Sequence, residues 1–304
     1  MNTVRVIARL DIKGPNLVKG IHLEGLRVLG KPEEFARHYY EMGADELIYQ
    51  DVVASLYERN SLADIISRTA SQIFIPLTVG GGLRTLEDIS AVLAAGADKV
   101  SINTAAIQDP ELIRQAARRF GSSTIVVAIE AIREPNGRYL AYTDNGRQHT
   151  GIDAIDWAAQ VEELGAGEIV ATSVDRDGTG EGYDPELNRR IADAVSIPVI
   201  AHGGPGRIEH IPDVIHQSGV DAVAVAGMLH YDAVHQIQQS DPNGHGAKEG
   251  NREFLKSGRR VSNIQSAGIP EIKLALAQSG IPCRISSGMS HPPGRLTLHR
   301  EAAR

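Results

Sequence analysis

The sequence predicts a (β/α)8 TIM barrel, and two observations predict it: a regular alternation of strand and helix patterns, and an internal repeat. Eight short runs rich in Val and Ile alternate with amphipathic helical patterns along most of the 304 residues. Such alternation implies parallel strands, and eight right-handed crossover units close naturally into a barrel. An open doubly wound sheet is the alternative, but it explains the repeat less well.

The internal repeat links residues 79–105, VGGGLRTLEDISAVLAAGADKVSINTA, with residues 200–227, IAHGGPGRIEHIPDVIHQSGVDAVAVAG. Each copy reads as a strand, a glycine turn, an amphipathic helix and the next strand. The copies lie four βα units apart, which predicts a barrel built from two half-barrel repeats.

The predicted elements follow one another with few interruptions. We expect strands at 5–11, 46–52, 75–80, 99–104, 124–132, 168–175, 197–203 and 222–227. We expect helices at 32–42, 62–72, 86–95, 110–120, 155–164, 185–195, 208–217 and 269–278. Turn signals within 135–151 predict a hairpin after the fifth strand, with 138–143 as one of its strands. Residues 1–285 are thus expected to form one domain, with a loose polar insertion at about 239–268 and a disordered tail at 286–304.

Composition excludes several function classes. Lys and Arg number 31 against 38 Asp and Glu, so a net charge of -7 gives no general reason to bind nucleic acid or an anionic membrane. The single cysteine and the absence of an apolar leader or an 18-residue apolar run predict a cytoplasmic protein. No nucleotide fingerprint and no metal-ligand spacing occur, so neither cofactor nor metal is expected, and His230 is expected at the surface.

The duplicated glycine turns at Gly81-Gly82 and Gly203-Gly204 predict two phosphate sites. Glycines let the backbone approach an anion closely, and a following helix offers free N–H groups. The alternative is that the glycines only make tight turns.

Polar residues at the predicted carboxyl ends of the strands form a second constellation. They are Asp11, Asp51, Asn103 with Thr104, Glu130, and residues 175–178. In a barrel these ends meet at one mouth, where Asp11 and Glu130 occupy equivalent places in the two halves. Such a pair of carboxylates suits acid and base catalysis, although each could be a solvated strand-end acid.

Four charged residues are predicted at the opposite, N-terminal end of the barrel. If Asp11 faces inward, strand periodicity turns Arg5 inward at the bottom, where Glu46, Lys99 and Glu168 open their strands. From the residues alone, these charges read as a structural ring of salt bridges.

Several separated motifs resemble the HisF family, the cyclase subunits of imidazole glycerol phosphate synthase. They are ARLDIK at 8–13, LVKG at 17–20, GADELIYQD at 43–51, IPLTVGGG at 75–82, GADKVSINTAA at 96–106, VVAIEA at 126–131 and TSVDRDGTGEGYD at 172–184. The resemblance runs from about residue 4 to 231 and resumes over the last predicted helix.

The resemblance implies a glutamine amidotransferase reaction. A HisH-like glutaminase subunit would dock at the N-terminal face of the barrel and deliver ammonia through it. The substrate would be a bisphosphorylated ribulosyl aminoimidazole carboxamide nucleotide, and the products imidazole glycerol phosphate and aminoimidazole carboxamide ribotide, in histidine biosynthesis. Neither metal nor cofactor is implied.

Family roles can be carried over by motif. Asp11 and Glu130 match the two catalytic positions, and Lys19 matches the lysine of a mobile loop that closes over substrate. One phosphate site is implied at Gly82, Asn103 and Thr104, and the other at Asp177, Gly178, Gly204, Ala226 and Gly227. The four charges Arg5, Glu46, Lys99 and Glu168 match an ammonia gate, which replaces the purely structural interpretation.

Departures from the family pattern cluster at the reacting centre. Glu130 stands where the family has aspartate, and Arg9, Gln50 and His202 stand where it usually has cysteine, leucine and serine. Two alternatives therefore accompany the histidine-pathway reaction. One is a paralogue that aminates or amidinates another substrate, such as a nucleotide sugar in surface-polysaccharide synthesis. The other is a non-catalytic scaffold that activates a glutaminase.

Overall fold

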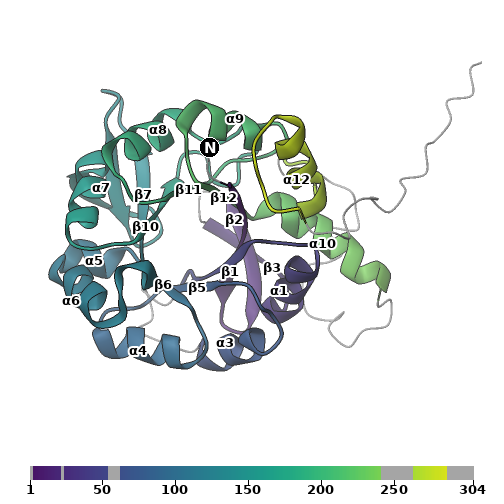
Figure 1. Cartoon of the computed structure of the whole chain (residues 1–304), viewed down its shortest axis with the longest axis horizontal. Helices are drawn as coiled ribbons and strands as arrows, with labels where there is room; N and C mark the ends of the chain where they lie inside the picture. Colours follow the sequence, from purple (N-terminus) through teal and green to yellow (C-terminus); the bar gives the residue numbers. More distant parts are fainter. Residues whose placement is uncertain (1–2, 22–23, 54–61, 241–262, 286–304) are drawn as a thin grey trace, which may run out of the picture.

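Eight parallel strands form a closed barrel in the computed structural model, which describes residues 3–21, 24–53, 62–240 and 263–285. The strands are β1 (Arg5–Lys13), β4 (Glu46–Asp51), β5 (Leu77–Gly80), β6 (Lys99–Ile102), β7 (Ile125–Arg133), β10 (Glu168–Ser173), β11 (Val199–His202) and β12 (Ala222–Val225). Neighbours in the chain pair in parallel, and β12 returns to pair with β1, which closes the ring (Figure 1). The predicted (β/α)8 fold is confirmed.

Helices cover the outside of the barrel between successive strands (Figure 1). Their starts follow local sequence: Pro32 opens one helix, while Asp153 and Asp184 accept hydrogen bonds from backbone N–H groups at the starts of two others. The described helices are α1 (Pro32–Glu41), α3 (Ala63–Ala70), α4 (Leu86–Ala94), α5 (Thr104–Gln108), α6 (Glu111–Phe120), α7 (Ala154–Glu163), α8 (Pro185–Ala194), α9 (His210–Ser218), α10 (Gly227–Ser240) and α12 (Ile269–Gln278), with a 3-10 turn at Ser122–Thr124.

Two apolar layers hold the barrel together, and strand periodicity separates them. On β1, Val6, Ala8 and Leu10 point outward into the large core between strands and helices. Ile7 points inward and joins a smaller cluster inside the barrel with Ile48, Val126, Ala128, Val170, Ile200, Ala222 and Ala224. This alternation confirms the inward direction predicted for the odd-numbered residues of β1.

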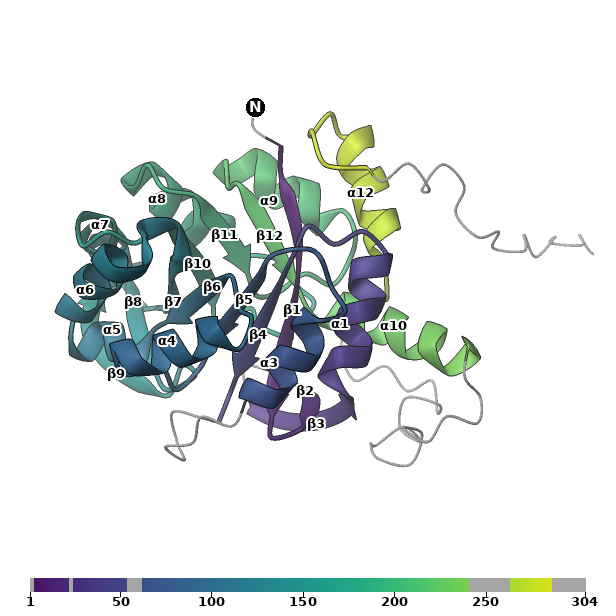
Figure 2. The same cartoon turned by 60° about the horizontal axis from the view of Figure 1, so that its bottom comes forward.

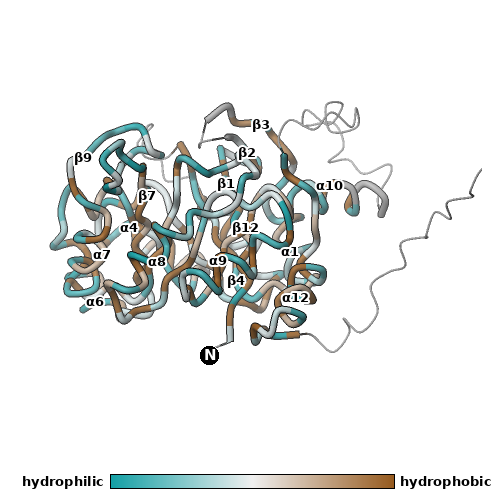
Figure 3. The backbone as a smooth tube through the Cα atoms, turned by 90° about the horizontal axis from the view of Figure 1, so that it is seen from above, coloured by the Kyte–Doolittle hydropathy of each residue, from teal (hydrophilic) through white to brown (hydrophobic). Residues whose placement is uncertain are grey.

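Two antiparallel hairpins extend from the carboxyl ends of the barrel strands. β8 (Tyr139–Thr143) and β9 (Gln148–Asp153) form the predicted hairpin after β7. β2 (Asn16–Ile21) and β3 (Glu24–Gly30) form another after β1, which the sequence patterns did not predict. Figure 3 places β2, β3 and β9 on the side opposite the N-terminus, so both hairpins rise beside the mouth of the barrel.

The described residues include both ends of the predicted polar insertion. Helix α10 continues to Ser240, and residues 263–267 cross back over the barrel, where Gln265 N–H donates to the carbonyl of Gly206 at 2.7 Å. Residues 241–262 and the predicted tail at 286–304 lie outside the described residues. Within the described residues, no helix combines the length and apolar character needed to cross a membrane. In Figure 2, α12 lies near the N-terminus and far from the hairpin of β2 and β3.

Candidate active site at the barrel mouth

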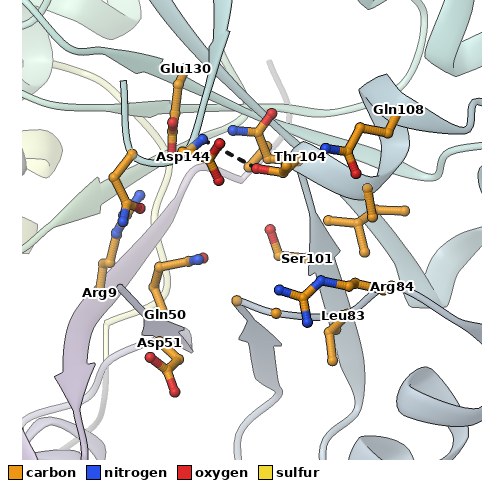
Figure 4. A pocket seen from close by; sticks show the side chains of 17 residues that line it. Arg9, Gln50, Asp51, Leu83, Arg84, Ser101, Thr104, Gln108, Glu130 and Asp144 are labelled. Atoms are coloured by element: carbon orange, nitrogen blue, oxygen red, sulfur yellow. Dashed lines mark hydrogen bonds between the residues drawn. The ribbon is translucent and has the colours of Figure 1, made fainter. Parts of the chain in front are cut away.

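A cavity of about 340 Å³ opens at the carboxyl ends of β1 and β4 to β7. Its walls include Arg9, Gln50, Asp51, Gly82, Arg84, Ser101, Asn103, Thr104, Gln108, Glu130 and Asp144 (Figure 4). Most of these side chains are polar and point into the cavity, as expected for a site that holds a polar, charged ligand. Its floor reaches Ala128, a member of the apolar cluster inside the barrel.

A buried guanidinium organises one side of this mouth. Arg9 is only 4% exposed; its Nε donates to Asp11 at 3.0 Å, and its Nη1 lies 3.1 Å from Nδ1 of His202. Burial raises the pKa of Asp11, but the Arg9 and Lys19 cations outweigh burial and hold that pKa below its ordinary value. Asp11 is therefore a stable carboxylate.

His202 is a neutral partner in this network. Burial, with Arg9 and Lys19 nearby, lowers its pKa well below the ordinary value. Because a guanidinium can only donate, Nδ1 must accept the Arg9 hydrogen bond, which leaves the ring proton on Nε2. Thr172 Oγ1 lies 3.2 Å from the same nitrogen and can donate to it.

Glu130 faces the same cavity in a different electrostatic state. Burial raises its pKa to about 7, and the attraction of Arg9 and a hydrogen bond of 2.8 Å from the N–H of Gly146 oppose that rise only in part. Asp11 and Glu130 thus differ near neutral pH: Asp11 is ionised, while Glu130 can gain or lose a proton. Environments that separate two carboxylates in this way are typical of a base and an acid.

The first predicted anion site lies in the large cavity. Gly82 (φ +71°) lines its wall together with Asn103 and Thr104, as predicted. Gly81 (φ +101°) is required by close packing, because a Cβ there would stand 2.2 Å from the carbonyl oxygen of Asp51. The Oδ1 of Asn103 is buried with no hydrogen-bond partner among the described residues.

The helix that meets this glycine turn is not the one that the sequence pattern indicated. Helix α4 begins at Leu86, and Thr85 with Asp88 closes its first turn in a capping box. The start of α5 at Thr104 lies beside the turn instead. The prediction that the helix directly after each glycine turn serves the anion site was therefore wrong for this copy.

The residues of the second predicted anion site lie together, but other side chains fill most of the space between them. Asp177, Gly178, Gly204, Ala226 and Gly227 line a cavity of only about 10 Å³, at the start of α10. Two further side chains occupy the space. Lys19 Nζ lies 3.3 Å from each carboxylate oxygen of Asp177, and Ile264 packs over Gly227. The room left holds about one water molecule, so an anion would have to displace these side chains.

The four charges at the opposite end of the barrel form a closed ring. Arg5 donates to Glu46 at 2.6 Å and to Glu168, while Lys99 donates to both glutamates at 3.0 Å. Their side chains are between 6% and 23% exposed. The ring lies below the apolar cluster inside the barrel, as the strand periodicity predicted.

Asp51 and Asp175, two other acids predicted at the mouth, lie in different places. Asp51 lines the large cavity. Asp175 turns away from it and accepts a hydrogen bond from the N–H of Arg133 at 2.8 Å. The prediction that His230 lies at the surface was wrong: it is fully buried and pairs with the hydroxyl of Tyr39 at 2.6 Å.

Sequence reasoning missed the residues that cover the mouth. Asp144, Asn145 and Gly146 form the tip of the β8–β9 hairpin over the large cavity, and Ile264 comes from the segment that follows α10. The Asp-Asn-Gly sequence indicated a turn but gave no sign of its position. Ile264 carries no local signal, because its place depends on a contact with a segment far away in the chain.

Comparison with known proteins supplies the family. The model of the histidine biosynthesis protein family matches residues 5–235. The chain is also 59% identical over 209 residues to imidazole glycerol phosphate synthase subunit HisF of Legionella pneumophila, which covers 69% of this chain and 99% of that protein. The chain belongs to the HisF family. The resemblance seen in separated motifs is thereby confirmed, and the matched range contains both halves of the mouth.

This HisF-family barrel has a polar mouth without a cluster of metal-ligand type. Among the described residues, no group of three His, Cys, Asp or Glu side chains is arranged to hold a metal ion. The groups that can act on a ligand there include Glu130, Arg9, Lys19, Asn103, Thr104 and the glycine turns.

Proposed function

We propose that the chain is the cyclase subunit of an imidazole glycerol phosphate synthase and uses ammonia from a glutaminase subunit. The observation that carries this proposal is the polar cavity at the carboxyl ends of the strands, where Glu130 lines the wall together with Arg9, which holds the Asp11 carboxylate in a buried ion pair. Cyclisation of a sugar-derived carbonyl needs both a proton acceptor and a proton donor near neutral pH. The family relationship supplies the reaction class in which such a pair would work.

The substrate would be the bisphosphorylated ribulosyl aminoimidazole carboxamide nucleotide. We assign one phosphate to Gly82, Asn103 and Thr104. The other belongs at the second cavity, formed by Asp177, Gly178, Gly204, Ala226 and Gly227. Holding both ends would fix the ketose carbonyl between the carboxylates, and such positioning can supply several kcal/mol of the barrier, roughly 7 to 11 in well-oriented model reactions.

Proton transfers follow from the two ionisation states. The nitrogen of ammonia attacks the ketose carbonyl, and Asp11 accepts a proton from that nitrogen. Glu130 donates a proton to the carbonyl oxygen, which gives a carbinolamine. Asp11 then returns its proton to the hydroxyl group, which departs as water, while Glu130 accepts the second proton from nitrogen, so an imine forms and both carboxyl groups are back in their starting states. The later C–N cleavage releases aminoimidazole carboxamide ribotide, and closure of the imidazole ring gives imidazole glycerol phosphate.

Ammonia would reach the mouth through the barrel. A HisH-like glutaminase docked at the N-terminal face would release it at the ring of Arg5, Glu46, Lys99 and Glu168. The apolar cluster above the ring favours a neutral molecule over a hydrated ion. The Arg9 cation at the top of that cluster opposes ammonium further, so the free base would be the transported species.

Substrate entry requires the second cavity to open. Lys19 would leave Asp177 and transfer its charge to the incoming phosphate, which matches the loop-closure role implied by the family motif. Ile264 would withdraw from Gly227 in the same step.

A direct assay tests the proposal. The purified chain should convert the histidine-pathway nucleotide into both products when ammonium salt is added without a glutaminase. Asp11→Asn should lower turnover by about a hundredfold or more, because the proton acceptor is lost. Absence of turnover at every ammonia concentration would reject the histidine-pathway assignment.

One observation favours a second candidate, a paralogue that aminates or amidinates another substrate such as a nucleotide sugar. Arg9, Asp11 and His202 form a buried network in the centre of the mouth, where the family usually has small or apolar residues at 9 and 202. A fixed guanidinium there could recognise a carboxylate or phosphate that the histidine-pathway nucleotide lacks at its centre. Turnover of a nucleotide sugar with ammonia, without turnover of the histidine-pathway nucleotide, would favour this candidate. If Asp11→Asn left every synthase activity intact, that result would favour the non-catalytic scaffold over both enzyme candidates.

A further inference from the structure

The tip of the β8–β9 hairpin has an unusual backbone. Asp144, Asn145 and Gly146 all adopt left-handed conformations, with φ of 54°, 60° and 75°. Asp144 and Asn145 are the two non-glycine residues of the described chain with positive φ. Such conformations cost roughly 1 kcal/mol or more per residue and persist where surrounding contacts enforce them.

Contacts from three directions hold this tip over the large cavity. Asn145 is 9% exposed, and its side-chain amide donates to the carbonyl of Val52 at 2.6 Å, which joins the loop after β7 to the loop after β4. The Asp144 N–H donates to Thr104 Oγ1 at 3.2 Å, as Figure 4 shows. The Gly146 N–H donates to Glu130 Oε2 at 2.8 Å.

The three contacts form one geometric unit. The Asn145 amide is the link to the opposite wall of the mouth, and the next residue carries the N–H that reaches Glu130. A Cβ at Gly146 would lie 2.8 Å from Val174 Cγ1, so the backbone at this point is also packed against the loop that follows β10. The direction of the Gly146 N–H is therefore set by the anchor at Asn145 on one side and by Val174 on the other.

We propose that Asn145 is a positioning residue, which anchors the hairpin tip to Val52 and thereby aims the Gly146 N–H at the Glu130 carboxyl group. The tip thus forms a fixed part of the wall of the candidate active site. This assignment of the anchor rests on geometry alone, while its effect on turnover rests on the proposed function.

The charges around Glu130 predict how loss of the Asn145 contact changes the protonation of Glu130. Arg9 on β1 favours the ionised carboxylate, Asp144 on the hairpin tip disfavours it, and the Asn103 side chain after β6 favours it. Thr172, the residue opposite on β10, is uncharged. Arg9 is already committed to Asp11 and His202, so it is poorly placed to replace a lost donor. Loss of the Gly146 hydrogen bond should therefore make protonation of Glu130 easier.

Asn145→Gly in the full chain tests the proposal. Glycine accepts the same left-handed backbone but removes the amide that contacts Val52. The protonation midpoint of Glu130 would be followed by NMR of protein labelled with glutamate carrying ¹³C in the carboxyl group, with the resonance assigned by its loss in Glu130→Gln. The midpoint should move upward by about one pH unit, the size expected for a weakened hydrogen bond to a charged group.

Asn136→Gly is the matched control, because Asn136 is a turn asparagine whose contact lies at the far end of β8, with the N–H of Arg138. Its Glu130 midpoint should equal that of the unmodified chain. Asn145→Ser also removes the amide that contacts Val52 without adding a charge near Glu130, and it guards against loss of folding in the glycine variant. A Glu130 midpoint unchanged in both folded Asn145 variants would overturn the proposal.

Turnover gives a second, separate readout. If the chain has the proposed activity, the Asn145 variants should lower kcat and shift the alkaline limb of the pH profile upward, with a smaller change in KM. Failure of the proposed function would remove this readout but leave the NMR titration intact, so the two outcomes are distinguishable.

Discussion

Glu130 is the residue at which stability and proposed chemistry conflict most clearly. Its carboxyl group is 7% exposed, and burial raises its pKa to about 7. The same burial that keeps an acid available near neutral pH also disfavours the ionised form of the folded protein. This carboxyl group accepts a hydrogen bond from the N–H of Gly146, a contact that the sequence could not indicate.

The pH dependence of turnover should reveal Glu130 as the acid. Because the protonated form is required, kcat with saturating free ammonia should fall as pH rises through about 7. Glu130→Gln should reduce kcat by roughly a hundredfold and remove this alkaline limb. The measurement is kcat against pH, with the ammonia concentration corrected for its own ionisation. An identical alkaline limb in the variant would show that another group supplies the proton.

Stability should also fall as pH rises, but over a lower range of pH. Glu130 has a raised pKa in the folded state, so below about 4.5 it is protonated in both states and adds no cost. Between about 4.5 and 7 the folded protein holds a proton that the unfolded chain releases, and stability falls as pH rises. The full cost, on the order of 3 kcal/mol, applies above that range.

Glu130→Gln should therefore gain free energy of unfolding relative to the unmodified chain at pH 8, while the difference should shrink at pH 4. Chemical denaturation at both pH values measures it. An advantage of equal size at both values would mean that the variant stabilises through packing rather than through the lost charge.

At the scale of elements, the segment 263–267 is tied to the barrel mouth by backbone hydrogen bonds. Gln265 donates to Gly206, and Ala267 donates to Met228 at 3.3 Å. These contacts hold Ile264 over Gly227 and leave about 10 Å³ in the second cavity. The segment thus restricts one anion site and leaves the other open.

Shortening the side chain at this point should favour anion binding. Ile264→Ala should tighten binding of inorganic phosphate by about threefold to tenfold, because less apolar contact has to be broken. Isothermal titration calorimetry measures the affinity. Ile281→Ala is the matched control, since Ile281 is also buried but follows α12, and it should bind phosphate as the unmodified chain does. Equal affinities for both variants would contradict the role given to Ile264.

A comparison of the predicted and observed elements shows which parts of the structure the sequence could predict. Regular alternation and the repeat predicted the barrel strands, and the turn signals within 135–151 predicted the hairpin after β7. The strand ends predicted that Asp11 and Glu130 lie at one mouth, where Glu130 lines the large cavity and Asp11 pairs with Arg9 of its wall. Helices α5 and α10 were missed because their starts continue directly from strand ends without a separate periodic segment. The positions of Asn145 and Ile264 depend on contacts between distant loops, which local patterns do not contain. Lys19 could be assigned to the mouth only through the family motif.

At the scale of the whole molecule, the barrel has two polar ends with an apolar interior between them. The charged ring closes the N-terminal end, and the cavity lined by Arg9 and Glu130 opens at the other. Each end draws residues from both half-barrels: Arg5 and Glu46 meet Glu168 below. Above, Arg9, which holds Asp11, lines the same cavity as Glu130. Duplication therefore explains the pairing of sites as well as the fold.

The ring should matter for delivery of ammonia and much less for chemistry at the mouth. Lys99→Ala removes the cation that bridges Glu46 and Glu168. In the complex with a glutaminase, glutamine-dependent turnover should fall severalfold relative to ammonia-dependent turnover. Arg114→Ala, which removes an exposed ion pair on the outer face of α6, should leave the ratio unchanged. An unchanged ratio in Lys99→Ala would count against passage through the ring.

The origin of the nitrogen incorporated into the product tests the central claim most directly. The complex of this chain with its glutaminase would turn over glutamine labelled with ¹⁵N in the side-chain amide, in the presence of excess unlabelled ammonium and the histidine-pathway nucleotide. A channelled cyclase should place the label in the imidazole ring well above its proportion in bulk ammonia. A ring labelled only to the bulk proportion, or no imidazole glycerol phosphate at all, would contradict the account.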